Sequence, residues 1–356
     1  MTRTGATAGA VTAIALAACS AQSPGAAATP KGDAAAADAG EVLGSEPPDA
    51  GDGLPPSFIP STAGALDEVG DSGPGTVSVD DASSDADPSS AYAVTIASST
   101  FTVPAGGEVY KCQDFANPFG GQAVDIDRYD LTMNVGSHHM LLFYKAGATD
   151  GSVIDCPQGG LMTGPYTFGA QSRTATLAYP AGIGAAVPGT MGFTVQMHYV
   201  NTSPTPITGQ ATVTMHVARP DTITQHAGVL NYVQTQFSIP PDNQPHVISA
   251  TCDLTQDVNI LSTGAHMHQR AQSFVAASGA TMLYQTDVWD DPPSKAFAPP
   301  LQLAQGAPIT WSCTYVNDTT GALTFGESAL TNAMCNFSAT FYPVADPSNP
   351  IVQCLQ

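Results

Sequence analysis

The sequence predicts an all-β protein with two consecutive antiparallel β-sandwich domains of jelly-roll-like type, preceded by a disordered N-terminal tether. Three observations favour this class. From residue 91 onward, segments alternate apolar and polar residues with a period of two, as half-buried strands do. Clusters of Pro, Gly, Asn and Asp separate these segments. No stretch of ten or more residues shows the apolar stripe of an amphipathic helix.

Residues 1–19 have the features of an export signal. Arg3 precedes an apolar run of small residues that is too short to span a bilayer as a mature helix and ends at Cys19 in "LAAC". This ending resembles a bacterial lipobox, in which Cys19 becomes the lipidated first residue of the mature chain. We therefore expect an exported lipoprotein anchored to the bacterial cell envelope, at the outer membrane, through its lipid alone. A plain signal peptide that is removed together with Cys19 is the alternative.

Residues 20–90 are predicted to form a disordered acidic linker. They are rich in Ala, Gly, Pro, Ser and Asp, lack apolar periodicity, and contain 13 acidic residues and one lysine. Such a segment repels itself and does not bury enough apolar surface to fold. The net charge of the whole chain is −21, which argues against nucleic acid and anionic lipid as partners.

The rest of the chain is predicted to form two sandwiches, residues 91–219 and 220–356. Their combined length is large for one sandwich, and the turn-like "ARPD" at 218–221 falls near the middle. The segment "GFTVQMHYV" at 192–200 illustrates the strand pattern, because four apolar residues alternate there with Thr194, Gln196 and His198.

Cysteine usage indicates disulfides rather than a metal site. Besides Cys19, the chain has six cysteines, an even number that favours three disulfides in an exported protein. Thiolate metal ligands are the rival interpretation, but the sequence contains no Cys-x-x-Cys pair.

Five of the eight histidines stand in patterns that suit a metal site. His266 and His268 are two residues apart on a predicted strand and so project from one face. His138 and His139 are adjacent and would point to opposite faces, unless a bulge, which the preceding Gly136-Ser137 permits, brings them together. His198 lies on the polar face of its strand. The other three are expected on an outer face or near turns, without a direct role: His216, His226 and His246.

Four segments, in order, carry a resemblance to a known family: "SHHMLLFYK", "VQMHYVN", "AHMHQR" and "ESALTNAMCNF". Each resembles a copper-binding segment of the ascorbate-dependent copper type II monooxygenases, the family of dopamine β-hydroxylase and peptidylglycine α-hydroxylating monooxygenase. The resemblance covers roughly residues 95 to 356. It implies two copper ions per chain, with six ligands: His138, His139 and His198 for the first, and His266, His268 and Met334 for the second. Imidazole suits both oxidation states of copper and thioether favours Cu(I), whereas zinc rarely takes Met.

The resemblance also implies how the site works. Oxygen and a small substrate meet at the second copper, so that its ligands are the catalytic ones, while the first copper stores an electron from ascorbate or a similar donor. Gln196 occupies a position linked to electron relay, with a structural strand-face amide as its alternative, and Asn336 is a possible substrate contact. The implied disulfides are Cys112–Cys156, Cys252–Cys354 and Cys313–Cys335.

Two positions depart from the pattern of the peptide-amidating enzyme, which has an arginine where this chain has Gly264 and a tyrosine where it has Ser338. Loss of a guanidinium removes a strong carboxylate contact, so a C-terminal glycine peptide is not the expected substrate. We expect a monomeric copper-dependent monooxygenase that hydroxylates an aliphatic C–H bond of a small substrate. A non-catalytic copper-storing or copper-sensing lipoprotein is the alternative, and a structural sandwich without metal is a third.

Overall fold

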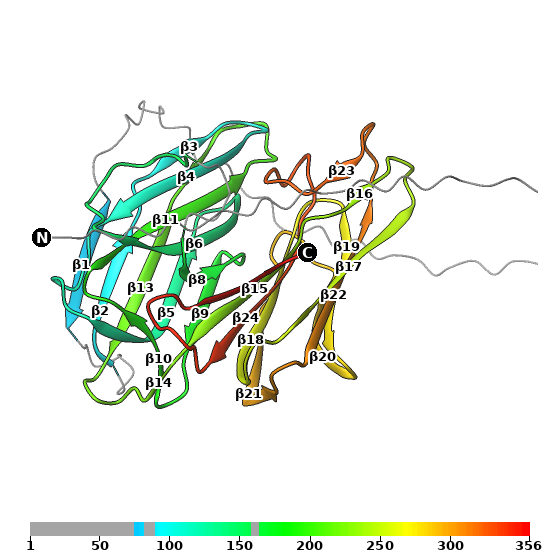
Figure 1. Ribbon diagram of the computed structural model, residues 1–356. Helices are drawn as coiled ribbons and strands as arrows, with labels where there is room; N and C mark the ends of the chain where they lie inside the picture. Colours follow the sequence, from blue (N-terminus) through cyan, green and yellow to red (C-terminus); the bar gives the residue numbers. More distant parts are fainter. Residues whose placement is uncertain (1–74, 82–89, 158–163) are drawn as a thin grey trace, which may run out of the picture. The chain divides into compact units, whose positions relative to one another are not determined.

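A computed structural model describes residues 75–81, 90–157 and 164–356 (Figure 1). The regular elements of these residues are all β-strands, so the predicted all-β, two-sandwich class is confirmed. No helix capable of crossing a membrane occurs in the described ranges. The predicted signal segment with Cys19, and most of the predicted linker, lie outside them.

The first sandwich packs two large sheets face to face. One has the strand order β1-β2-β13-β5-β10-β14, with β9 also paired to β5, and the other has the order β7-β4-β11-β6-β8. A small β3–β12 sheet lies beside them. The bounds are β1 (Thr76–Asp81), β2 (Ser90–Ala97), β3 (Phe101–Val103), β4 (Glu108–Phe115), β5 (Val124–Met133), β6 (Ser137–Ala146), β7 (Ile154–Asp155), β8 (Tyr166–Ala170), β9 (Thr174–Ala178), β10 (Ile183–Val187), β11 (Met191–Val200), β12 (Ile207–Gly209), β13 (Ala211–Ala218) and β14 (Gln225–His226).

The second sandwich has a sheet of order β21-β18-β24-β15-β25 and a sheet of order β17-β22-β19-β20, with a small β16–β23 pair. The pairs β15–β25 here and β10–β14 in the first sandwich are parallel, which the purely antiparallel expectation did not include. The bounds are β15 (Gly228–Gln234), β16 (Ser238–Ile239), β17 (Pro245–Asp253), β18 (Val258–Met267), β19 (Ala271–Ser278), β20 (Thr281–Thr286), β21 (Lys295–Leu303), β22 (Pro308–Val316), β23 (Leu323–Thr324), β24 (Cys335–Tyr342) and β25 (Ile351–Leu355).

Each sandwich has its own core, as the period-two pattern requires. In the first, β11 places Phe193, Val195, Met197 and Tyr199 between the sheets. In the second, alternate residues of β22 and β24 surround the fully buried Trp311. The opposite face of β11 is also buried, because it is turned toward the second sandwich rather than toward water. Its polar residues are therefore interior groups that need partners.

The N-terminal strand corrects part of the predicted linker. Residues 76–81 form β1, which pairs along its length with β2 at the edge of the first sandwich. The exposed fractions of Val77 and Val79 are 42% and 58%, so the strand is held by backbone hydrogen bonds and not by buried side chains. Because its side chains are exposed, this strand shows no clear apolar periodicity, and its sequence resembles the acidic linker around it.

The chain passes from one sandwich to the other after His226. β14 still pairs with β10 of the first sandwich and β15 opens the second, so the crossing falls a few residues beyond the expected boundary at 219/220. The two sandwiches pack into one compact unit, in part through a small apolar cluster of Phe143, Tyr166 and Val229.

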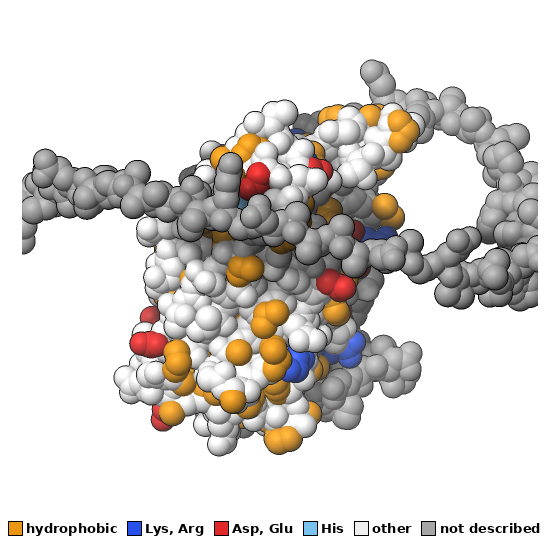
Figure 2. Space-filling view, turned by 90° about the vertical axis from the view of Figure 1, so that its right-hand side faces the viewer, with side chains coloured by type: hydrophobic (Ala, Val, Ile, Leu, Met, Phe, Trp, Pro, Cys, Tyr) orange, Lys and Arg blue, Asp and Glu red, His pale blue; other side chains and the backbone are white. Residues whose placement is uncertain are grey.

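One face of the second sandwich carries few charged side chains. Figure 2 shows a face on which few Lys, Arg, Asp or Glu side chains stand among scattered hydrophobic and uncharged polar ones. Exposed apolar residues of the four-stranded sheet include Val247, Val275 and Met282. Single exposed apolar side chains of this kind are ordinary on soluble proteins.

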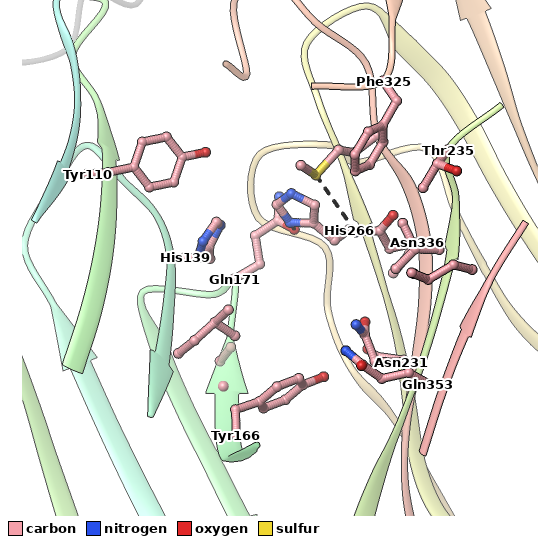
Figure 3. A pocket seen from close by; sticks show the side chains of 18 residues that line it. Tyr110, His139, Tyr166, Gln171, Asn231, Thr235, His266, Phe325, Asn336 and Gln353 are labelled. Atoms are coloured by element: carbon pink, nitrogen blue, oxygen red, sulfur yellow. Dashed lines mark hydrogen bonds between the residues drawn. The ribbon is translucent and has the colours of Figure 1, made fainter. Parts of the chain in front are cut away.

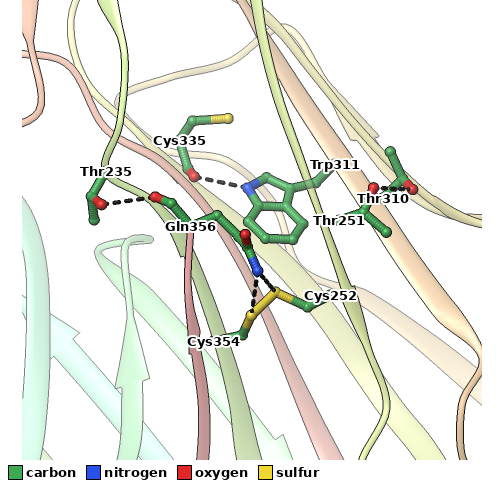
Figure 4. Close-up of a disulfide and its surroundings, with 8 residues drawn as sticks. All are labelled: Thr235, Thr251, Cys252, Thr310, Trp311, Cys335, Cys354 and Gln356. Atoms are coloured by element: carbon green, nitrogen blue, oxygen red, sulfur yellow. Dashed lines mark hydrogen bonds between the residues drawn. A yellow bond between two sulfur atoms is a disulfide. The ribbon is translucent and has the colours of Figure 1, made fainter. Parts of the chain in front are cut away.

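The three disulfides have the implied pairings, Cys112–Cys156, Cys252–Cys354 and Cys313–Cys335. Two of them join the two sheets of the second sandwich, one from β17 to β25 and one from β22 to β24. Figure 4 shows the first of these beside Gln356, whose amide Nε2 donates to the Sγ of Cys354 at 3.2 Å. The other fixes the start of β24, immediately after Met334.

Candidate metal centre and its cavity

A β-bulge on β6 brings the adjacent histidines to one side. His139 lies directly opposite His198 on β11, and the next residue of β11, Tyr199, pairs with Ser137, so His138 is the extra residue. Gly136, with φ of 89°, supplies the turn that precedes it. The bulge that Gly136-Ser137 permits is present, and it turns a neighbouring pair into two side chains that share a site.

The second pair of histidines lies at the end of β18. His266 is still in the strand, opposite Asn336 of β24, and His268 follows the last strand residue. The buried hydroxyl of Tyr315 accepts from the backbone N–H of His268 at 3.0 Å and donates to the carbonyl oxygen of Met334 at 2.6 Å. One tyrosine thus fixes the backbone of two predicted ligands. Met267, between the histidines, points into the core.

The five histidines form one cluster, called here the five-histidine cluster. The ring of His138 has centroid distances of 4.8 Å to His198, 4.9 Å to His266, 5.5 Å to His139 and 5.6 Å to His268. The ring of His139 is 5.0 Å from that of His266. The two expected ligand sets therefore adjoin, which the sequence did not predict. Nitrogen atoms of His138, His139 and His266 lie within 4.8 Å of one another, close enough to hold one ion between the two sandwiches.

The cluster is a set of imidazoles, several of whose buried ring nitrogens lack hydrogen-bond partners in the described part of the chain. Four of the rings are buried, whereas His266 keeps part of its surface open to a cavity. Among the described residues, six ring nitrogens make no hydrogen bond of ordinary geometry: His138 Nε2, both of His139, His198 Nδ1 and both of His268. Buried polar atoms normally have partners, so six unpaired nitrogens at one place are typical of a site that takes a ligand.

Burial keeps these imidazoles neutral. Desolvation lowers the pKa of His139 to about 4 and that of His268 to about 3. It also lowers the pKa of His138, His198 and His266 well below the ordinary histidine value, with a further contribution from the neighbouring rings. A neutral imidazole presents the lone pair that a transition metal binds. The donor set therefore fits a nitrogen-preferring metal such as copper.

Met334 lines the same cavity as His139 and His266, and Figure 3 labels these two histidines. Its sulfur is 3.7 Å from the amide Nδ2 of Asn336, which is the residue opposite His266. The structure thus brings the thioether to the cavity that His266 faces. Gln196 is fully buried on the same face of β11 as His198, and its side chain raises the pKa of His139 against the effect of burial.

Glu108 and Tyr110 support His198 and were not predicted. Glu108 Oε1 lies 2.8 Å from His198 Nε2, and the same carboxylate accepts from the backbone N–H of Ala329 at 2.6 Å and from the hydroxyl of Ser328 at 2.5 Å. The ring of Tyr110 stacks on His198 at 3.8 Å. Glu108 thereby directs the other ring nitrogen of His198, Nδ1, into the cluster. Because the same carboxylate also accepts from Ser328 and Ala329, Glu108 links His198 to the loop before Met334.

Gln171 connects the two sandwiches at the cluster and was also not predicted. Its Oε1 lies 3.0 Å from His266 Nδ1, and its Nε2 lies 3.4 Å from His138 Nδ1 and donates to the carbonyl of Trp289. An acceptor oxygen at Nδ1 of His266 favours the tautomer whose Nε2 carries the lone pair. In the sequence, Gln171 stands in an ordinary turn after a strand, so no local pattern marks it.

The remaining histidines have conventional surroundings. In each of them, Nε2 lies close to an aspartate carboxylate. The distance is 2.8 Å from His216 to Asp130, 2.9 Å from His226 to Asp125 and 2.9 Å from His246 to Asp242. All three side chains keep some contact with solvent, so each is an ordinary, partly exposed hydrogen-bonded pair, although Nδ1 of His216 has no partner among the described residues.

A cavity of about 460 Å³ lies between the sandwiches beside the cluster. Strands β4, β6 and β8 of the first sandwich form one wall, and β18, β24, β15 and β25 of the second form the other. The predicted substrate contact Asn336 lines it, and so does Ser338. Gly264 lies directly opposite Ser338 in the same sheet.

No family model matches the chain, and no curated protein matches it. Among solved structures, the major capsid protein P2 of bacteriophage PM2 covers 68% of this chain and 97% of its own length at 8% identity, with a TM-score of 0.28. The empty top-component particle of cowpea mosaic virus covers 70% and 94% at 8% identity, with a TM-score of 0.32. Likenesses this weak carry no argument about function or assembly.

Proposed function

We propose that the chain is a copper-dependent monooxygenase that hydroxylates an aliphatic C–H bond of a small substrate with oxygen and a one-electron donor such as ascorbate. The observation that carries the proposal is the five-histidine cluster, in which six unpaired ring nitrogens converge beside a cavity that Met334 also lines. The ordered sequence segments that resemble the copper type II monooxygenases support the choice of metal and reaction.

The proposed ligands are the six predicted from the sequence: His138, His139, His198, His266, His268 and Met334. Bound copper would supply one-electron redox chemistry and the means to reduce oxygen. The overall reaction inserts one oxygen atom into the C–H bond and converts the other to water, so it consumes two electrons and two protons. Two molecules of a one-electron donor supply those electrons.

The protein's own part is to hold neutral ligands and to place the substrate. Glu108 and Gln171 fix the orientation of His198 and His266 before any metal arrives. Burial between the sandwiches excludes water from the cluster, while the cavity gives a small molecule access to the side where His266 and Met334 lie.

The direct test combines copper loading with turnover in the wild-type chain and in Met334→Ala. The proposal expects two copper ions per wild-type chain and ascorbate-driven oxygen uptake that depends on a substrate drawn from phenethylamines, glycine-extended peptides and small alkyl aromatics. Met334→Ala should lose most of the turnover. Two tightly bound copper ions without oxygen uptake above the free-copper background would favour the copper-storing or copper-sensing alternative. Absence of tight copper would rule out both.

A further inference from the structure

The cavity beside the five-histidine cluster is lined by uncharged side chains, and we infer that its substrate is a neutral small molecule with an amide, carbonyl or hydroxyl group on an apolar body. This inference deepens the proposed function and rests on it. It follows from the strand register of one wall, from the absence of charge among the described lining residues, and from the cavity's size.

The register of the second sandwich arranges this wall in rows across four strands. The row at the metal end contains His266 of β18, Asn336 of β24, Val233 of β15 and Leu355 of β25. The row two residues further along contains Gly264, Ser338, Asn231 and Gln353. Residues two apart on a strand share a face, so both rows face the cavity, about 7 Å apart.

The second row is a neutral hydrogen-bonding patch. Asn231 and Gln353 each carry an amide that both donates and accepts, and Ser338 carries a hydroxyl that does the same. Figure 3 shows Tyr166, from the opposite wall, with its hydroxyl directed toward the side where Asn231 and Gln353 lie. Groups of this kind recognise amides, carbonyls and hydroxyls.

No Asp, Glu, Lys or Arg occurs among the described residues that line the cavity. An ionised ligand group removed from water without a counter-charge costs several kcal/mol, even after relaxation of its surroundings. The neutral patch can satisfy hydrogen bonds of a polar group but cannot balance a carboxylate or an ammonium. Leu141, Val233 and Phe325 supply apolar surface for the rest of the ligand. A volume of about 460 Å³ is that of a small-molecule site.

The test measures binding, not turnover, with a matched set of probes: 3-phenylpropanamide, 3-phenylpropanoate and 3-phenylpropylammonium. Titration calorimetry on the chain with and without Cu(I) gives each Kd. The amide should bind at least ten-fold more tightly than either charged probe. Equal or tighter binding of a charged probe overturns the inference, and so does failure of all three to bind.

Charge-altering variants sharpen the test. A Cβ at Gly264 would have Ser338 Oγ at 3.4 Å as its nearest neighbour, so the backbone there accepts a Cβ, and the side chain would project from the same face as His266. Gly264→Arg should shift the preference at least ten-fold toward the carboxylate, and Asn231→Asp should shift it toward the ammonium. Gly264→Gln is the uncharged control of similar length and should retain the preference for the amide. Unchanged preferences in both charged variants would show that this row does not contact the ligand.

The proposed function and the neutral-ligand inference can each fail while the other stands. Selective binding of the amide by a chain that never hydroxylates any substrate would remove the proposed function and leave the neutral-ligand inference standing. Hydroxylation of a charged probe in preference to the amide would overturn the neutral-ligand inference and leave the proposed function standing.

Discussion

The eight histidines of this chain occupy two contrasting environments. His216, His226 and His246 each contact an aspartate and keep contact with solvent. The five-histidine cluster lies between two sandwiches, and in the described part of the chain His198 is its one member beside a carboxylate. A hydrogen bond to an aspartate accounts for one ring nitrogen of each histidine in the first group, and Nδ1 of His216 is a buried nitrogen of this group without a partner among the described residues. The second group leaves six ring nitrogens unpaired, a cost of about 1–3 kcal/mol for each buried polar atom, unless a ligand takes them.

Residue type alone therefore does not identify a metal site in this chain. What distinguishes the cluster is the combination of burial, neutral imidazoles and convergence from both halves of the chain. Each histidine outside it lacks at least one of these properties. Substitutions in the cluster should therefore change copper binding and stability, whereas matched substitutions at the three histidines outside it should not.

Removal of a cluster histidine should abolish tight copper binding. His266→Ala takes away a ligand that the second sandwich contributes to the cluster. Copper affinity should therefore fall by more than the 10- to 100-fold that is typical when a metal ligand loses its hydrogen-bond partner. His246→Ala removes a histidine held only by Asp242 and should leave copper affinity unchanged. Competition titration against a Cu(I) chelator measures both. Equal affinities of the two variants would contradict the division of the histidines into two groups.

The copper-free chain should lose stability in mild acid. The pKa of His139 is about 4 in the fold against about 6.5 in the unfolded chain, so between these values the unfolded state binds the proton and the fold does not. Stability from this group is therefore complete above pH 6.5 and falls toward pH 4, by roughly 3 kcal/mol at the limit. Urea unfolding at pH 7 and pH 5 measures the loss. His139→Gln should weaken this pH dependence and His246→Ala should not, and the opposite ranking would show that the cluster is not desolvated.

Loss of the carboxylate behind His198 should have the smallest effect. Glu108→Gln keeps an oxygen for the N–H of Ala329 but removes the charge beside His198, so copper affinity should fall by roughly 10-fold. The matched control is Asp242→Asn, which makes the same change beside the isolated His246 and should leave copper affinity unaltered. A Glu108→Gln chain with wild-type affinity would show that this carboxylate serves only the packing of the loop.

Local sequence patterns were sufficient for the strands and for single ligand pairs. The period-two alternation of β11 placed His198 opposite the core, and Gly136-Ser137 permitted the bulge that joins His138 to His139. The disulfide pairings came from the family resemblance, since spacing alone left them open. β1 was missed because its valines are exposed and only backbone pairing holds it.

The arrangement of the site depends on contacts that no local pattern encodes. Glu108 meets Ser328 across 220 residues, and Gln171 meets His266 across 95. Strand periodicity tells which face a side chain occupies but not which face of the other sandwich lies against it. For this reason the sequence predicted two ligand sets, while their union in one cluster and the neutral cavity beside it required the structure.

The most direct test of the central claim is X-ray absorption by copper in the Cu(I)-loaded chain. Copper bound by the five-histidine cluster and Met334 predicts a coordination shell of imidazole nitrogen with one sulfur contribution. The sulfur contribution should disappear in Met334→Leu, while the nitrogen shell remains. A wild-type spectrum without sulfur, a sulfur signal that survives Met334→Leu, or an imidazole shell that persists unchanged after removal of His139 and His266 together would contradict the account.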